Sequence, residues 1–239
     1  MRIYAIGDVH GRADLLKQLV GLVAGDATQH SAQHRVLILL GDYIDRGPQS
    51  AEVLEYLSSA GMPLDEYHFL LGNHEQMLLG FLQDPLGHAY WLEYGGLATL
   101  GSYGVAHRGP DPDALIETAA SLAAALPAHQ RAFLEQLEYS CRFGDYFFAH
   151  AGIRPGVSPE EQDPRDLIWI RDTFLQHRKA HPLMVVHGHQ ALEEIDVRSN
   201  RIGIDTGAYA NGRLTCLVLD GTARWIVDTV LGEFVSLAS

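Results

Sequence analysis

Short apolar runs alternate with segments of helical spacing over the first 80 or so residues of this chain. The runs RIYAIG, VLILLG and YHFLLG occupy residues 2–7, 36–41 and 67–72. Between and after them, residues 15–23, 50–57 and 75–82 repeat apolar side chains at the spacing of an amphipathic helix. Runs that are apolar on both faces are typical of buried parallel strands, so their alternation with helices predicts an α/β fold.

The rest of the chain follows a different pattern. Residues from about 84 to 131 hold an aromatic and glycine-rich piece, AYWLEYGGLATLGSYG, and then an alanine-rich helical stretch that breaks at Pro127. We interpret this region as a helical excursion. Strand-like pieces linked by turn residues come next, namely LEYSCRF, YFFAH, LMVVHG, RIGID, LTCLVL and ARWIVDTV. The length of 239 residues favours one domain, 1–239.

Charge and composition narrow the classes of partner. The chain has 17 basic and 30 acidic residues and a formal charge of -13, which opposes binding to nucleic acid or to an anionic membrane. An anionic substrate therefore needs local positive charge, which bound divalent cations supply. The apolar runs are shorter than the roughly 20 residues of a membrane span, and no signal segment precedes GDVHG, so we expect a cytoplasmic protein. Cys141 and Cys216 are expected to be free thiols.

Five of the strand-like runs end in side chains that bind metals or phosphate. These are Asp8 and His10 in GDVHG, Asp42, Asp45 and Arg46 in GDYIDRG, Asn73 and His74 in GNHE, His150 in HAG, and His187 and His189 in HGH. Ligands of α/β sheets bind at the carboxyl ends of strands, where these groups can converge. Oxygen and imidazole ligands without thiolate suit Mn, Fe or Zn, and an arginine grips phosphate in bidentate fashion.

Each motif alone also has an ordinary structural interpretation. Asp8 after a strand is a common turn residue, Asn73 at the start of a helix is a common N-cap, and a single histidine at a strand end is usually just hydrogen-bonded. The ordered set of five motifs, each after an apolar run, favours a joint site over coincidence.

In this order the motifs resemble those of the phosphoprotein-phosphatase branch of the calcineurin-like metallophosphatases, in particular its small bacterial and phage members. GNHEQM, the Trp and Gly-Gly of WLEYGG, IWIR and IDTGA also have counterparts there. The resemblance covers most of the chain and implies a two-sheet β-sandwich flanked by helices in four layers, α/β/β/α. Bacterial diadenosine tetraphosphatases share several of the same motifs.

The resemblance also implies a role for each site residue. Two divalent metal ions are expected, with Mn²⁺ the first candidate in vitro and Fe or Zn as alternatives. The first ion would be bound by Asp8 and His10, Asp42 would bridge both ions, and the second would be completed by Asn73, His150 and His189. His74 would donate a proton to the leaving oxygen with Asp45 orienting it, while Arg46 and Arg171 would hold phosphate oxygens.

Several assignments stay open in the sequence. Register against Gly188 favours His189 over His187 as the ligand, and His187 is then expected to support the site from behind or to pack in its strand. The superfamily often has a second histidine at Gly-His-x-His, where this chain has Ala191, and this favours the protein-phosphatase branch. Trp91 and Tyr94 either line a substrate cleft or form a small core. Glu75 is expected to favour the helix start through the helix dipole.

The expected activity is metal-dependent hydrolysis of a phosphomonoester. A serine/threonine or dual-specificity protein phosphatase acting on a phosphoprotein or a small phosphorylated substrate is the leading hypothesis. Hydrolysis of diadenosine tetraphosphate is the alternative, and a non-catalytic phosphate-binding scaffold is the third hypothesis.

Overall fold

The computed structural model describes residues 1–239 except 31, 33, 60, 62–63 and 238–239. Within these residues the first sheet has the strand order β11 (Val235–Ser236), β10 (Ala223–Asp228), β9 (Thr215–Asp220), β1 (Arg2–Ile6), β2 (Arg35–Leu39) and β3 (Glu66–Phe69). Strands β1, β2 and β3 run parallel, and β9 pairs with β1 in the antiparallel sense. The three apolar runs of the amino-terminal region are therefore the neighbouring parallel strands that the sequence predicts.

The second sheet is also mixed. Its order is β4 (Ser140–Phe143), β5 (Tyr146–Ala149), β6 (Met184–His187), β8 (Arg201–Gly203) and β7 (Asp196–Val197). The inner strands β5, β6 and β8 are parallel, and the outer strands β4 and β7 are antiparallel to their neighbours. Each sheet thus has adjacent parallel strands, and the loops after their carboxyl ends carry the predicted site residues.

Alternate residues of the central strands face two different layers. Tyr4 and Ile6 of β1 pack with the buried face of the first helices, whereas Ile3 and Ala5 pack against the second sheet. Because side chains of a strand alternate between faces, a strand covered on both sides must be apolar throughout. This is the physical reason for the unbroken apolar runs in the sequence.

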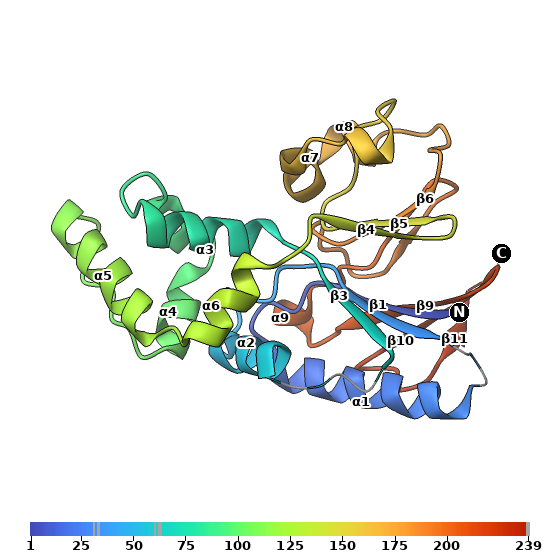
Figure 1. Ribbon diagram of the computed structural model, residues 1–239, viewed down its shortest axis with the longest axis horizontal. Helices are drawn as coiled ribbons and strands as arrows, with labels where there is room; N and C mark the ends of the chain where they lie inside the picture. Colours follow the sequence, from blue (N-terminus) through green and yellow to red (C-terminus); the bar gives the residue numbers. More distant parts are fainter. Residues whose placement is uncertain (31, 33, 60, 62–63, 238–239) are drawn as a thin grey trace.

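Helices cover the outer face of each sheet. The helices α1 (Ala13–Gln29) and α2 (Ser50–Ser59) lie on the first sheet, while α7 (Pro164–Trp169) and α8 (Asp172–Leu175) lie on the second (Figure 1). Between the second sheet and its helices, the strand residues Phe147 and Val185 pack against the helix residues Leu167 and Phe174. The predicted α/β architecture of two sheets between helices is confirmed.

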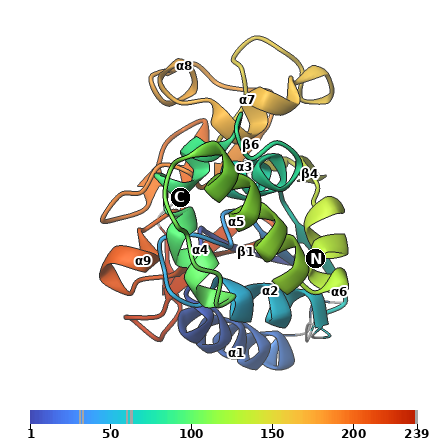
Figure 2. The same cartoon turned by 90° about the vertical axis from the view of Figure 1, so that its left-hand side faces the viewer.

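Residues 84–135 leave the layers as a run of helices at one end of the molecule. They are η1 (Ala89–Leu92), α4 (Gly96–Ser102), α5 (Pro112–Ala125) and α6 (Ala128–Glu135). Of these, η1 and α5 pack on α3 (Asn73–Gln83), whereas α4 and α6 pack on α2 (Figure 2). Asp111 caps α5 by accepting from the N–H of Ala114 at 3.0 Å, and Pro112 occupies the first turn, where its missing N–H costs no bond.

The remaining short elements are η2 (Pro159–Glu161) and α9 (Ala208–Asn211), which precedes β9. Cys141 is half-buried and Cys216 is buried, and both are free thiols. Across the part of the chain that the structure describes, no helix has the length and apolar character to cross a bilayer.

Candidate metal centre

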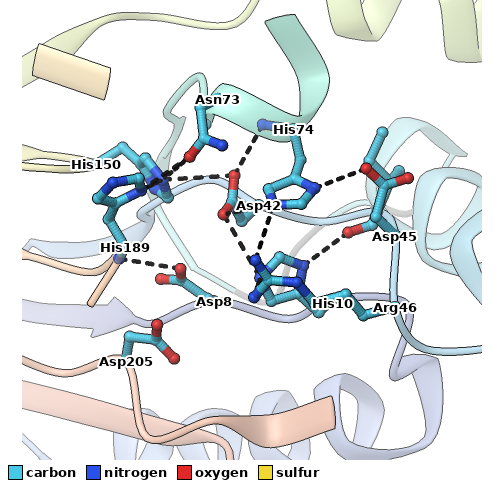
Figure 3. A network of polar contacts seen from close by, with 12 residues as sticks. Asp8, His10, Asp42, Asp45, Arg46, Asn73, His74, His150, His189 and Asp205 are labelled. Carbon is cyan, nitrogen blue, oxygen red and sulfur yellow. Dashed lines mark hydrogen bonds and ion pairs between the residues drawn. The ribbon is translucent and has the colours of Figure 1, made fainter. Parts of the chain in front are cut away.

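Five strand ends from both sheets bring the predicted ligands together (Figure 3). Asp8 and His10 follow β1, Asp42 follows β2, Asn73 begins α3 after β3, His150 follows β5 and His189 follows β6. The ligand atoms form two groups, and within each group all of them lie within 4.8 Å of one another. One group is His10, Asp42 and His74, and the other is Asp42, His150 and His189. Asp42 belongs to both groups, which is the position predicted for a bridging carboxylate.

Backbone carbonyls fix which ring nitrogen of two histidines faces the site. Nδ1 of His10 lies 2.9 Å from the carbonyl of Ile44, and Nδ1 of His150 lies 2.9 Å from the carbonyl of Leu40. A carbonyl only accepts, so Nδ1 carries the proton in both rings and the Nε2 lone pair of the neutral ring points into the site. Metal-binding histidines are held in this way.

In the second group, ring nitrogens and side-chain oxygens of four residues face one another at short range. Nε2 of His150 lies 3.1 Å from Oδ1 of Asn73 and 3.4 Å from Oδ1 of Asp42. Nδ1 of His189 lies 2.8 Å from the same Asn73 oxygen and 3.2 Å from His150 Nε2. Converging lone pairs repel unless a proton or a cation lies between them, so this donor set fits a divalent cation.

The buried carboxylates of Asp8 and Asp205 lie close to each other beside the second group (Figure 3). Asp8 accepts from the backbone N–H of His189 at 3.0 Å through Oδ2, but among the described residues its buried Oδ1 has no hydrogen-bond partner. Burial raises the pKa of Asp8 well above its usual value, and the nearby carboxylates Asp205 and Asp42 raise it further. A bound cation would relieve both the desolvation and the repulsion.

Two of the three predicted histidine ligands fit the same interpretation, whereas at His150 burial opposes the charged form but the carboxylate of Asp42 outweighs it and raises the pKa. Burial lowers the pKa of His10 to about 3 and that of His189 to about 2, so both rings are neutral at pH 7, as metal ligands must be. Burial opposes the charged form of Asp42, but the imidazoles of His150 and His74 outweigh it and hold the pKa of Asp42 well below its usual value. Asp42 is therefore ionised.

His74 is held by the predicted orienting group. Its Nδ1 donates to Oδ2 of Asp45 at 2.6 Å, which leaves Nε2 facing Asp42 at 3.8 Å. Asp45 is itself fixed, because it also accepts from Trp91 Nε1 at 2.8 Å and from the hydroxyl of Thr99 at 2.6 Å. Trp91 is fully buried against Phe81, so the core interpretation applies to it, together with a bond to Asp45 that the sequence did not indicate.

The two predicted arginines are placed differently. Arg46 lies in the site, with NH1 2.9 Å from Nε2 of His10 and NH2 3.2 Å from Nε2 of His74. Its guanidinium lies over the ring of Tyr209 at 5.0 Å from the centroid. Arg171 is exposed at the start of α8, and within the described residues its guanidinium makes no hydrogen bond, although its charge contributes to lowering the pKa of His189.

Backbone strain is concentrated in this site. Among the described residues other than glycine, a positive φ occurs at His10, Asp42, Asp45, Arg46 and His189, with values from 43° to 70°. Such conformations cost of order 1–3 kcal/mol each in L-residues and persist where the surroundings impose them. All five residues belong to the predicted site, which agrees with strain kept for function.

Glu75 does more than favour the start of α3, which is the role predicted for it from the sequence. Its buried carboxylate accepts from the backbone N–H groups of Gly72, Asp42, Tyr43 and Ile44, at 3.1, 2.9, 2.7 and 3.3 Å. It thereby ties the loop after β2 to the first turn of α3. Because Asp42 has a φ of 51°, this bracket holds Asp42 in its strained backbone conformation.

His187 lies outside both ligand groups. It is buried at the end of β6, where its ring packs edge-on against Phe174 with centroids 5.0 Å apart. Asp205, which sequence reasoning did not select, lies beside Asp8 instead (Figure 3). Asp205 follows β8 in Ile204-Asp205-Thr206-Gly207, just as Asp8 follows β1. Its position after a strand is therefore the signal in the sequence that could have identified it.

The family model described as "Calcineurin-like phosphoesterase" matches residues 1–220. The chain belongs to the calcineurin-like phosphoesterase family. This metallophosphoesterase family implies divalent cations, and the convergent ligand groups of this member fit them. The superfamily predicted from the motifs is confirmed, whereas the phosphoprotein-phosphatase branch stays a prediction.

Individual relatives of this phosphoesterase carry two kinds of name. A symmetrical bis(5'-nucleosyl)-tetraphosphatase of Proteus mirabilis is 45% identical over 80 residues, which is 34% of this chain but only 26% of that protein. A symmetrical tetraphosphatase of Nitrosospira multiformis is 26% identical over 92% of this chain and 93% of its own length. Serine/threonine-protein phosphatase 2 of Salmonella typhimurium is 27% identical over 89% of this chain and 90% of its own length.

Proposed function

We propose that this phosphoesterase is a metal-dependent hydrolase of dinucleoside polyphosphates. The observation that carries the proposal is the likeness to bis(5'-nucleosyl)-tetraphosphatases, which reaches 45% identity in one segment and extends over 92% of the chain in another relative. The proposal reverses the order of the two hypotheses drawn from the motifs, because tetraphosphatases recur among the similar proteins from several bacteria.

The ligand groups suit a polyphosphate. Asp8, His10 and Asp42 would hold one cation, and Asp42, Asn73, His150 and His189 the other. Two such cations would supply Lewis-acid activation of the phosphoryl group and of the attacking water. This local positive charge also lets a protein of formal charge -13 accept a highly anionic substrate.

The protein's own side chains would bind and protonate the substrate. Arg46 donates to the lone pair of His10 in the structure, so a cation on His10 would free its guanidinium to hold phosphate oxygens, with Arg171 from the exposed side. Burial disfavours the charged form of His74, but Asp42 and Asp45 outweigh it and raise the pKa of His74. A protonated His74 would then give its proton to the leaving oxygen.

The test compares two substrates on one preparation of the protein with Mn²⁺. We expect kcat/KM for diadenosine tetraphosphate to exceed that for a phosphoserine peptide, with loss of turnover after treatment with EDTA and recovery on re-addition of metal. Faster hydrolysis of the phosphopeptide would overturn the proposal in favour of the second candidate. Unchanged turnover after thorough chelation would overturn the metal mechanism for either substrate.

The second candidate is a serine/threonine protein phosphatase. It is supported by the relative of that name in Salmonella typhimurium, which is 27% identical over 90% of its length, and by Ala191 in place of the second histidine. The non-catalytic scaffold is the third hypothesis, and it requires phosphate binding by calorimetry without turnover of any substrate. The polarised pair of His74 and Asp45 favours a catalyst over a scaffold.

A further inference from the structure

An aromatic cleft adjoins the metal centre. It has a volume of about 470 Å³ and is lined by Gln76, Tyr90, Tyr94, Arg165 and Trp169. This volume lies within the roughly 300–1,000 Å³ of clefts that bind small molecules. The residues come from three separate parts of the chain: α3, the segment around η1, and α7.

Contacts join the cleft to the ligand residues. The ring of Trp169 packs edge-on against the ring of His189, with centroids 6.5 Å apart. Gln76 follows Asn73 by three residues on α3, which places the two side chains on the same face of the helix. The cleft therefore lies next to two of the predicted ligand residues, His189 and Asn73.

The tyrosine side of the cleft is tied to the phosphate-binding arginine. Tyr94 directly precedes Gly95, whose carbonyl accepts from the backbone N–H of Arg46 at 3.3 Å. Because Gly95 has a φ of 116° and a side chain there would meet Arg46, the two backbones approach closely. Tyr94 is thus positioned relative to Arg46 although it is itself a surface residue.

The aromatic rings are open to a ligand. Tyr90 and Tyr94 are 42% and 53% exposed and meet edge to face with centroids 6.3 Å apart. Trp169 is partly buried and fixed, since its Nε1 donates to Oε1 of Gln76 at 2.7 Å. That bond uses the acceptor of Gln76 and leaves its amide N–H donors for a ligand. Exposed aromatics clustered around polar groups mark a recognition site for a flat partner.

We propose that this cleft is a nucleobase subsite, in which a purine stacks on Trp169 or on the tyrosines while the attached phosphates lie at the metal centre. The inference rests on the proposed function and adds the group that selects the substrate. A purine base has acceptor nitrogens at its edge that match the amide N–H donors of Gln76. A phenyl ring alone has no polar edge that would use these donors.

The test uses a pair of probes that differ only in the base. AMP and ribose 5-phosphate share the ribose and phosphate, and their dissociation constants are measured by calorimetry on the full chain with Mn²⁺. We expect AMP to bind at least about fivefold more tightly, the factor given by stacking of one base on an aromatic side chain. Equal affinities would overturn the subsite.

Variants locate the effect. In Tyr94→Ala and in the double variant Tyr90→Ala/Tyr94→Ala, the ratio of the two dissociation constants is expected to fall towards one. Tyr67→Ala removes a tyrosine of similar exposure, 47%, on β3, outside the cleft, and should leave the ratio as in the wild type. A ratio that persists in the double variant and in Trp169→Ala would place the base elsewhere and overturn the assignment. Free phosphotyrosine binding as tightly as AMP would also overturn it.

These outcomes separate the subsite from the proposed function. Preferential binding of AMP without hydrolysis of diadenosine tetraphosphate would refute the substrate but keep the cleft. Hydrolysis of diadenosine tetraphosphate with equal binding of AMP and ribose 5-phosphate would refute the cleft but keep the substrate.

Discussion

At the scale of single residues, the side chain of Asp42 contacts histidines on both sides of the site. Its two oxygens face His10, His74 and His150 at 3.4 to 3.8 Å, and its Oδ1 also accepts from the N–H of His74. It is the member common to both ligand groups. Loss of its charge would therefore affect both ligand groups at once.

Asp42→Asn keeps the shape of this side chain and removes its charge. We expect metal affinity to fall by more than the roughly 100-fold that loss of a partner behind a ligand costs, and turnover to be abolished. Metal content after dialysis and hydrolysis of p-nitrophenyl phosphate are the measurements, with circular dichroism to check the fold. Asp220→Asn, at the far end of the first sheet, is the matched control. Two equivalents of metal in the Asp42 variant would refute the bridging role.

Tyr209 is a second residue with a consequence for catalysis. Its ring lies 5.0 Å from the guanidinium of Arg46 and edge-on to His10 at 5.4 Å. A cation over an aromatic face gains about 1 kcal/mol at a partly exposed site, so Tyr209→Ala should lower kcat/KM roughly fivefold through a less ordered Arg46. Tyr209→Phe keeps the ring and should retain near-normal activity. Equal losses in the two variants would show that the hydroxyl acts instead.

At the scale of elements, close backbone packing lets the ligand loops meet. Each of Asp8, Asp42, Asn73 and His189 follows a glycine. A side chain at Gly72 would collide with the carboxylate of Asp42, and one at Gly188 would collide with Asp8. These glycines are needed for close approach of the loops, which the turn propensity of Gly-Asp and Gly-Asn does not reveal.

Glu75 joins two of these elements, the loop after β2 and α3. Glu75→Gln replaces one acceptor oxygen by an NH₂ group, so two of the four backbone N–H donors lose their acceptor. We expect unfolding by urea to show a loss of roughly 2–6 kcal/mol, since each of the two unsatisfied buried donors costs about 1–3 kcal/mol. Glu117→Gln, exposed on α5, should leave the midpoint unchanged. A wild-type midpoint for Glu75→Gln would mean that the bracket contributes nothing.

The elements were predictable from the sequence where the pattern was local. The unbroken apolar runs identify β1, β2 and β5 because burial on both faces leaves no other choice. The motif residues were predictable because each follows such a run. Other contacts join residues that are far apart in the sequence, so no local pattern predicts them. Trp91 and Asp45 are 46 residues apart, and Glu75 is 31 to 33 residues from the N–H groups that it accepts from after β2.

At the scale of the whole molecule, the site is built from residues that follow strands of both sheets. Asp8, His10, Asp42 and Asn73 extend from the first sheet, and His150 and His189 from the second. The buried interface between the sheets is apolar, with Ile38 and Ala5 facing Val186 and Ile202. The polar centre lies at the edge of this interface and contains carboxylates that repel one another.

Bound cations should therefore stabilise the whole fold as well as the chemistry. The ligands lie up to 181 residues apart, so the unfolded chain has no comparable site and metal binds the native state alone. At 100 times the dissociation constant this contributes about 2.7 kcal/mol. For a chain of this size, that corresponds to a rise in Tm of about 5–10 °C in Mn²⁺ over EDTA. Thermal unfolding followed by circular dichroism measures the shift, and Asp42→Asn should lose it. If Mn²⁺ restores activity but leaves Tm unchanged at that excess, the cations do not bind between the sheets as the ligand geometry requires.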